Sequence, residues 1–332
     1  MLTVGLIGAG RIGRVHASTI VQDEGSQLVA VADSVDENAK NLAKLYKVNP
    51  RSVDAIFEDN SIEAILIASS TDTHSDFIEK ASKAGKAILC EKPVDLSLAR
   101  AKRCLENTKS NEHLIMMGFN RRFDPNFVAL KNALDGGEIG TAELLSITSF
   151  DPAPPPIDYV KVSGGIFKDM MIHDFDMANF LYGELPKSVF VSASAIIDKK
   201  IGALGDYDTA VATLKYRDGR LAVIKNSRRA TYGYDQRIEV LGSKGLLQVQ
   251  NMVENSMVKS TEMGVESSKP EYFFLERYKS AYQNEWTAFV TAVKTKTPMP
   301  VSLSDGIAAL AIAEAAAASA EMGSEVEIAN FL

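Results

Sequence analysis

Gly5-Leu-Ile-Gly-Ala-Gly-Arg-Ile-Gly13 is the stretch that decides the fold, because a short apolar run is followed at once by glycines at positions 8, 10 and 13. In a G-x-G-x-x-G pattern Gly8 allows a tight turn, Gly10 lets the backbone approach a pyrophosphate, and Gly13 lets helix and strand pack closely. The pattern follows a predicted strand and opens a predicted helix over residues 11–21, whose first N–H groups suit phosphates. A plain strand–turn–helix corner is the alternative, but this context favours a dinucleotide-binding loop.

An acidic residue ends the second predicted strand where a dinucleotide-binding fold needs one. Asp33 stands twenty residues after Gly13, and such a carboxylate accepts hydrogen bonds from the hydroxyls of the adenosine ribose. Ser34 and Val35 follow, so no lysine or arginine there would balance the charge of a 2′-phosphate. The sequence therefore predicts NAD rather than NADP as the cofactor.

The first 120 residues alternate between short apolar runs and helix-like segments. The runs are continuous rather than alternating, which is typical of a parallel sheet covered on both faces. Repeated strand–helix units predict a doubly wound α/β Rossmann sheet. The expected strands lie at residues 4–8, 28–33, 64–68, 87–90 and 114–118, and the expected helices at residues 11–21, 36–46, 74–84 and 97–108.

The pattern changes after residue 120. Closely spaced strands follow, and Asp218-Gly219 marks a hairpin between two of them. We therefore expect a Rossmann domain over residues 1–120 and an α+β domain over 121–332, with a large, mostly antiparallel open sheet. The last helices are candidates to pack back on the first domain. Expected strands are 142–150, 188–197, 207–216, 220–227, 236–241 and 245–249, and expected helices 126–134, 278–295 and 304–322.

Composition excludes several classes of protein. The 332 residues are 46% apolar with a net charge of -7, and no basic run exceeds two residues, so a nucleic-acid partner is not expected. Residues 307–320 look too short and too weakly hydrophobic to cross a membrane. Cys90 and Cys104 are the only cysteines, which predicts neither a disulfide framework nor a zinc signature. With no secretory signal pattern at the start, we expect a cytoplasmic protein.

Residues 167–180, Phe-Lys-Asp-Met-Met-Ile-His-Asp-Phe-Asp-Met-Ala-Asn-Phe, contain the only histidine of the second half of the chain. On a helix, Asp169, His173 and Asp176 share one face. The preceding Gly164-Gly165 would let the backbone run close to a ligand. A second stripe suited to packing consists of Met171, Phe175, Ala178 and Tyr182.

Three interpretations of His173 compete. It could be paired with Asp169 for structural reasons only, it could ligate a metal with Asp169 or Asp176, or it could transfer a proton. The other histidines fall at positions 16, 74 and 113 and no cysteine is near, so no metal is expected. A histidine titrates near neutrality and suits the proton step of alcohol oxidation.

Glu91-Lys92-Pro93 follows the fourth predicted strand. The carboxyl ends of parallel strands border the ligand crevice, so a lysine there is placed for chemistry. A surface lysine at a strand end is the plain alternative.

Together, the glycine loop, Glu91-Lys92-Pro93 and Asp169-x-x-x-His173 resemble the glucose–fructose oxidoreductase / inositol dehydrogenase (Gfo/Idh/MocA) family over essentially the whole chain. The stretches 118–125 and 226–245 are similar to those of its bacterial myo-inositol 2-dehydrogenase subgroup. One departure is Ser70, where many relatives have proline in a segment that lines the nicotinamide side.

The resemblance implies three catalytic residues: His173 as general base, Asp169 orienting its ring, and Lys92 stabilising the developing alkoxide. The cofactor-binding residues that it implies are Gly8, Gly10, Arg11, Ile12, Gly13, Asp33, Ser34, Ser69, Thr71, His74, Glu91 and Lys92. The implied substrate contacts are Lys92, Asn120, Arg121, Asp151, Asp169, His173, Asp176 and Tyr232, with Arg122 and Tyr234 as further candidates. Arg121 and Arg122 could instead be salt-bridge partners, and both tyrosines could be core residues.

The activity that the resemblance implies is NAD-dependent oxidation of myo-inositol to 2-keto-myo-inositol (scyllo-inosose). Alternatives are a dehydrogenase for another inositol (scyllo- or D-chiro-) or for an aldose such as glucose. A non-catalytic dinucleotide-binding regulator is an alternative of another class, which the intact Lys92, Asp169 and His173 disfavour. An open apolar sheet face is seldom left exposed, and the resemblance implies dimers and tetramers formed through this sheet, so we expect a homotetramer.

Overall fold

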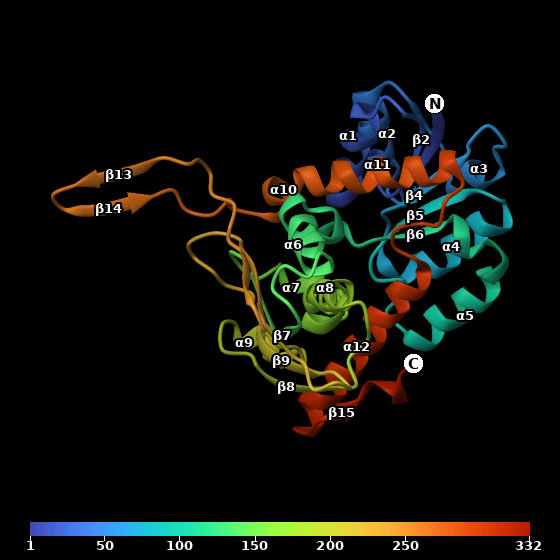
Figure 1. Cartoon of the computed structure of the whole chain (residues 1–332). Helices are drawn as coiled ribbons and strands as arrows, with labels where there is room; N and C mark the ends of the chain where they lie inside the picture. The colour runs from blue at the N-terminus through green and yellow to red at the C-terminus, as the bar shows by residue number, and fades with distance from the viewer. The chain divides into compact units, whose positions relative to one another are not determined.

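A six-stranded parallel sheet organises the first unit in the computed structural model of the chain, which describes residues 1–332 (Figure 1). Its order is β3-β2-β1-β4-β5-β6, and every pairing is parallel. The order reverses at β1, so the crevice for a dinucleotide opens at the carboxyl ends of β1 and β4. The strands are β1 (Leu2–Ile7), β2 (Ser26–Ala32), β3 (Asn49–Pro50), β4 (Ala64–Ile67), β5 (Ala87–Glu91) and β6 (Ile115–Gly118).

The central strands are buried on both faces, as their continuous apolar sequences predict. Every residue of β4 and β5 is buried, because helices cover both sides of the sheet. The predicted doubly wound Rossmann sheet is therefore confirmed. The two-residue edge strand β3 was not predicted. The helical segments of this part are α1 (Arg11–Gln22), α2 (Asp36–Tyr46), α3 (Val53–Glu58), η1 (Thr71–Thr73), α4 (His74–Lys83), α5 (Leu98–Thr108), η2 (Lys109–Leu114) and η3 (Asn120–Phe123).

A helix from near the end of the chain belongs to the unit that contains the parallel sheet. The chain packs as two compact units, residues 1–123 with 280–310, and residues 124–279 with 311–332. Helix α11 (Lys279–Thr295) contributes Trp286, which is 1% exposed and donates its indole N–H to the Ser26 hydroxyl at 2.9 Å. The only tryptophan of the chain therefore lies in the nucleotide-binding unit and is a natural fluorescence probe of it.

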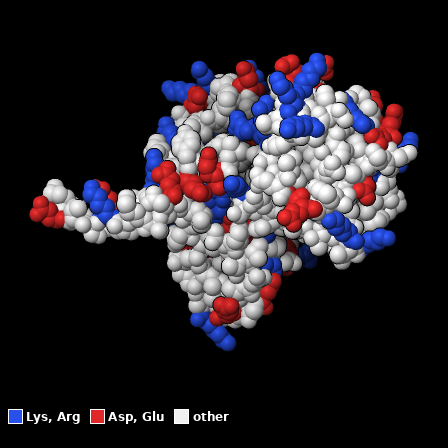
Figure 2. All heavy atoms as spheres, turned by 90° about the horizontal axis from the view of Figure 1, so that it is seen from above, with Lys and Arg blue, Asp and Glu red and all other residues white.

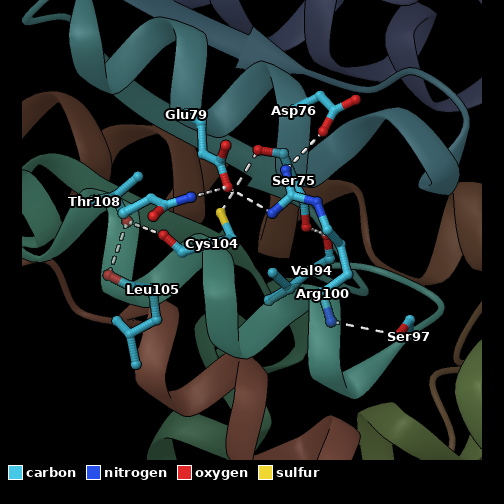
Figure 3. A network of polar contacts seen from close by, with 10 residues as sticks. Ser75, Asp76, Glu79, Val94, Ser97, Arg100, Cys104, Leu105 and Thr108 are labelled. Atoms are coloured by element: carbon cyan, nitrogen blue, oxygen red, sulfur yellow. Dashed lines mark hydrogen bonds and ion pairs between the residues drawn. The ribbon is translucent and has the colours of Figure 1, made fainter.

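Helices α4 and α5 are joined by a polar network (Figure 3). The Arg100 guanidinium lies between Glu79 at 2.5 Å and Asp76 at 2.6 Å, and the Cys104 thiol faces the Ser75 carbonyl oxygen at 3.6 Å. Burial raises the pKa of Cys104 to about 12, so this thiol is an inert packing group. The network explains the pairing of the two helices and needs no catalytic interpretation.

The second unit contains a seven-stranded mixed sheet in the order β12-β11-β7-β10-β9-β8-β15. Only β7 and β10 pair in parallel, and all other neighbours are antiparallel. The predicted, mostly antiparallel sheet is confirmed. Its strands are β7 (Ala142–Phe150), β8 (Ser188–Ser194), β9 (Thr209–Lys215), β10 (Leu221–Ser227), β11 (Asp235–Gly242), β12 (Gly245–Val249) and β15 (Val326–Glu327).

Helix α8 (Ile172–Tyr182) covers one face of this sheet (Figure 1). The predicted packing stripe is confirmed, since Phe175 and Ala178 are fully buried. The buried Asp174 carboxylate accepts hydrogen bonds from Ser149 of β7 at 2.6 Å and from Asn226 of β10 at 2.7 Å, which ties the helix to the sheet. The other helical segments are α6 (Pro125–Asp135), α7 (Ile157–Ser163), η4 (Phe167–Met171), α9 (Lys199–Ala203), α10 (Phe274–Arg277) and η5 (Ile328–Asn330).

The opposite face of the sheet is open and carries a row of leucines. Leu241 of β11 lies beside Leu246 on β12 and Leu144 on β7, and Leu144 lies beside Leu221 on β10. All four are between 37% and 46% exposed. Beyond the sheet, the hairpin of β13 (Val258–Thr261) and β14 (Gly264–Ser267) extends away from its unit with every strand residue exposed (Figure 1).

Helix α12 (Leu303–Met322) is longer than the apolar segment recognised in the sequence. The most apolar 18-residue window of this helix has a mean hydropathy of 1.3, so by length and composition alone the helix could cross a bilayer, contrary to our expectation from residues 307–320. However, 61% of its most apolar window is buried, and the core helices of soluble proteins pass the same test. On the face drawn in Figure 2, basic and acidic side chains are interspersed, without a broad basic surface.

Candidate functional site

The glycine loop fits a pyrophosphate by its backbone. Gly8 has a φ of +102°, and a Cβ there would lie 2.3 Å from the Ala68 carbonyl oxygen. At Gly13 a Cβ would lie 2.0 Å from the Gly8 carbonyl oxygen, whereas at Gly10 it would meet nothing within 4 Å. Gly10 is the N-cap of α1 and has no side chain that could cap the first N–H groups of the helix, which suits a phosphate at this end.

Two neighbours of the loop, Arg11 and Ile12, form the first turn of α1, which contains no acidic residue that would repel a phosphate. The Asp33 carboxylate braces the loop, because its Oδ2 accepts the Ala9 N–H at 2.6 Å and its Oδ1 accepts the Val35 N–H at 2.8 Å. Ser34 is exposed beside it. Asp33 thus has a structural task besides the ribose contact that the sequence predicts.

Beyond β4, a second loop carries Ser69, Thr71 and His74. Ser69 and Thr71 are partly exposed, whereas His74 is only 1% exposed. The His74 Nδ1 lies 2.8 Å from the Pro93 carbonyl oxygen and its Nε2 lies 3.2 Å from that of Ser69. Burial lowers the pKa of His74. Its ring therefore joins the two loops at the crevice, and a direct cofactor contact by His74 stays a prediction.

The Glu-Lys-Pro motif lies at the end of β5, where two glutamates, Glu91 and Glu285, are buried. Glu91 is 7% exposed, and its Oε1 lies 2.7 Å from Nε2 of His16 on α1. Lys92 is partly exposed at the strand end. Behind this pair, Glu285 of α11 is fully buried, and neither of its carboxylate oxygens has a hydrogen-bond partner in the protein. Burial, and then the charge of Glu91, raise the pKa of Glu285 well above its usual value.

The polar residues after β6 lie in η3. Asn120 is 3% exposed and Arg121 is 5% exposed. Arg122 Nη2 lies 3.3 Å from the Asp305 carboxylate, so the salt-bridge interpretation holds for Arg122. Substrate contacts by Asn120 and Arg121 stay predictions.

In the second unit, Asp169 lies in η4, a turn of π-helix that runs directly into α8. The shared face predicted for Asp169 and His173 assumed regular α-helical spacing, which the π turn alters; such turns often occur at functional sites. His173 is partly exposed, whereas Asp176 is only 1% exposed. A Cβ at Gly165 would lie 2.8 Å from Oδ1 of Asp206, so the glycine is needed for this contact within the protein, and an approach of Gly164-Gly165 to a ligand stays a prediction.

The two tyrosine candidates, Tyr232 and Tyr234, differ in exposure. Tyr234 is 6% exposed, whereas Tyr232 is 47% exposed and donates its hydroxyl to Oδ2 of Asp235 at 2.6 Å. They lie in a turn before β11, and only Tyr234 belongs to the core. Burial and the Asp235 carboxylate raise the pKa of Tyr232 to about 12. Asp151 is partly exposed beside this turn, and its backbone oxygen accepts the Ala230 N–H at 2.7 Å.

Sequence reasoning missed several polar residues around these candidates, because their partners are distant along the chain. His16 reaches across 75 positions to Glu91, and Arg228 reaches across 59 positions to Asp169. The only signal in the sequence was an ionisable residue in an apolar helix or at a strand end. No group of three or more His, Cys, Asp or Glu side chains is arranged to hold a metal ion.

A doubly wound parallel sheet with a glycine loop at its switch point, an acid after β2 and a lysine after β5 defines a nicotinamide-dinucleotide oxidoreductase. Residues 2–119 match the oxidoreductase family with an NAD-binding Rossmann fold, and residues 127–248 match the GFO/IDH/MocA C-terminal domain. The chain therefore belongs to the GFO/IDH/MocA oxidoreductase family. It is an NAD-dependent oxidoreductase, as its sequence predicts.

Curated relatives match it over nearly their full length. The chain is 48% identical to the inositol 2-dehydrogenase of Rhizobium meliloti and 45% identical to the myo-inositol 2-dehydrogenase of Thermotoga maritima, over 98% of each chain. A solved myo-inositol dehydrogenase from Corynebacterium glutamicum superposes with a TM-score of 0.95 at 40% identity, over 98% of both chains. The scyllo-inositol dehydrogenase of Lactobacillus casei, solved with NAD(H) and scyllo-inositol, superposes with a TM-score of 0.92 at 27% identity, over 99% of both chains.

Proposed function

We propose that the protein oxidises myo-inositol to 2-keto-myo-inositol (scyllo-inosose) with NAD. The observation that carries this proposal is the near-full-length similarity to inositol 2-dehydrogenases of a chain that contains Lys92, Asp169 and His173. Bound at the glycine loop, NAD supplies the acceptor for the hydrogen and electron pair that leave the carbinol carbon.

Three side chains have separate tasks in this mechanism. His173 takes the proton of the substrate hydroxyl as the carbonyl forms, because an imidazole is basic enough near neutral pH. Lys92 donates a hydrogen bond to the same oxygen and stabilises its developing negative charge. Asp169 orients the His173 ring and stabilises the imidazolium that results. Asn120, Arg121, Asp151, Asp176 and Tyr232 are the proposed partners of the remaining hydroxyls.

The test is the rise in reduced-nicotinamide absorbance with a polyol panel, using NAD and NADP in parallel. The panel contains myo-, scyllo- and D-chiro-inositol, glucose and xylose. Turnover with myo-inositol and NAD, lowered about 100-fold or more in His173→Ala, is the expected result. His113→Ala, at an exposed histidine of η2, is the matched control.

Other outcomes would change the proposal in defined ways. Faster turnover with scyllo-inositol would move the substrate to the second candidate, which the Lactobacillus casei similarity favours. Near-normal turnover of His173→Ala would refute its role as the base. Tight NAD binding without turnover of any polyol would favour a non-catalytic regulator.

We also propose that the protein is a homotetramer assembled through the open face of the second sheet. The leucine row of Leu144, Leu221, Leu241 and Leu246 supports this, because adjacent exposed apolar residues on a sheet mark an interaction surface. Leu241→Glu would place a charge in the middle of this row and is expected to lower the mass measured by light scattering. A wild-type monomer at micromolar concentration would contradict the assembly. We further propose a cytoplasmic location, which the two buried free thiols support.

A further inference from the structure

Two side chains without a task in the proposed mechanism contact Asp169. Both terminal nitrogens of Arg228 lie 3.3 Å from Oδ2 of Asp169, and Tyr159 donates its hydroxyl to Oδ1 at 2.8 Å. Each carboxylate oxygen therefore has a donor of its own. Since a carboxylate accepts about four hydrogen bonds, these donors leave capacity for one from His173.

Arg228 is itself held in place through both its backbone and its side chain. It follows β10, and its backbone N–H donates to the Asp208 carbonyl oxygen at 2.8 Å. Its Nη2 lies 4.0 Å from Oδ2 of Asp206, whose Oδ1 accepts the Ile166 N–H at 2.9 Å. Ile166 begins the helical segment that contains Asp169. The guanidinium and the start of that segment are thus anchored to the same carboxylate.

The fold alone gives little reason for a charged group at this position. Arg228 is 1% exposed, and its Nε has no hydrogen-bond partner in the protein. Burying an ion pair costs about as much desolvation energy as the attraction returns, so an apolar side chain of similar size often serves the fold equally well. The value of the guanidinium therefore lies in the carboxylates that it faces, of which Asp169 accepts both of its hydrogen bonds.

Tyr159 of α7 contacts the other carboxylate oxygen of Asp169, Oδ1. It is 47% exposed, so its hydroxyl contributes little to the packing of the core. Donors on both oxygens resist rotation of the carboxyl group about its Cβ–Cγ bond. A freely rotating carboxylate would present its lone pairs to His173 only part of the time, which would lower the rate of proton transfer.

We propose that Arg228 and Tyr159 are positioning residues for the proton-transfer step, because together they hold the Asp169 carboxylate in the orientation from which it aligns His173. The proposal rests on the proposed function of Asp169 and His173. It adds Arg228, directly after β10, and Tyr159 of α7 to the residues that position the catalytic groups.

The first measurement is steady-state oxidation of the polyol that the wild type oxidises fastest, with NADH binding measured separately by quenching of Trp286 fluorescence. A displacement of about 1 Å in a catalytic group costs about 100-fold in rate. We expect kcat to fall about 100-fold in Arg228→Met and about tenfold in Tyr159→Phe. Arg228→Lys should recover part of the loss, and the affinity for NADH should not change.

The decisive measurement repeats each substitution in an Asp169→Asn background. If Arg228 and Tyr159 act through Asp169, then Arg228→Met or Tyr159→Phe should lower kcat no further once Asp169 is replaced. A merely structural role would instead multiply the two losses. Matched controls are Arg229→Met and Tyr272→Phe, which alter exposed residues of the same unit and should leave kcat unchanged.

The outcomes separate the two proposals. Normal turnover of Asp169→Asn would overturn both the role of Asp169 and this inference. A slow Asp169→Asn with a normal Arg228→Met and Tyr159→Phe, or with multiplying losses, would overturn the inference alone. If Arg228→Met does not fold, as judged by circular dichroism, the Tyr159→Phe cycle decides, because that change removes only a partly exposed hydroxyl.

Discussion

Replacing Glu285 with glutamine is expected to stabilise the protein near neutral pH and to change its stability little at pH 4.5. Glu285 is fully buried without a hydrogen-bond partner in the protein, and burial raises its pKa well above the usual value. The folded state therefore keeps a proton that the unfolded state releases above a pH of about 4.3. Stability that is present below this pH is lost as the pH rises towards the pKa of the folded state.

The size of the effect follows from this linkage. Each pH unit between the two pKa values costs about 1.4 kcal/mol, so two units cost about 2.7 kcal/mol. Glutamine resembles the protonated acid in shape and has no proton to lose, so this cost disappears. For a unit of this size, about 2.7 kcal/mol corresponds to a rise in Tm of about 5–10 °C.

The assay is thermal unfolding followed by circular dichroism at pH 4.5 and pH 6.5, on either side of the isoelectric point of about 5.3. The gain in Tm of Glu285→Gln over the wild type should appear at pH 6.5 and be small at pH 4.5. Glu106→Gln, at an exposed glutamate of α5, should show no such difference. An equal gain at both pH values, or a loss at pH 6.5, would refute the reasoning.

Other substitutions test the cofactor unit. Gly10→Ala enters open space, so it should leave Tm unchanged but weaken NADH binding about tenfold or more by obstructing the pyrophosphate; unchanged affinity in a fluorescence titration would contradict the predicted loop contact. Gly13→Ala would meet a backbone oxygen at 2.0 Å, and should lower the free energy of unfolding by about 1–3 kcal/mol in addition. His16→Ala leaves the buried Glu91 carboxylate without its imidazole partner and should cost about 1–3 kcal/mol; an unchanged Tm would show that this contact contributes no net stability.

Elements with strong local patterns could be predicted from the sequence. The helix over residues 36–46 and the strands over 142–150 and 245–249 have the predicted bounds. Their periodicity and end signals lie within a few residues, so no distant contact is needed to recognise them. The same holds for the glycine loop, whose residues adjoin in the chain. The NAD cofactor, the oxidoreductase class and the family followed from that loop and two further short motifs.

Features that depend on distant partners were decided only by the tertiary structure. The parallel pairing of β7 with β10, the burial of Glu285 beside Glu91, and the contacts of Arg228 with Asp169 join segments that carry no local sign of one another. The π turn at Asp169 is likewise outside a regular periodicity. A sequence pattern reports which face of an element is apolar, whereas the neighbour of a buried charge is chosen by the packing of the whole unit. The motifs thus identified the candidate catalytic groups, and the fold determined which side chains surround them.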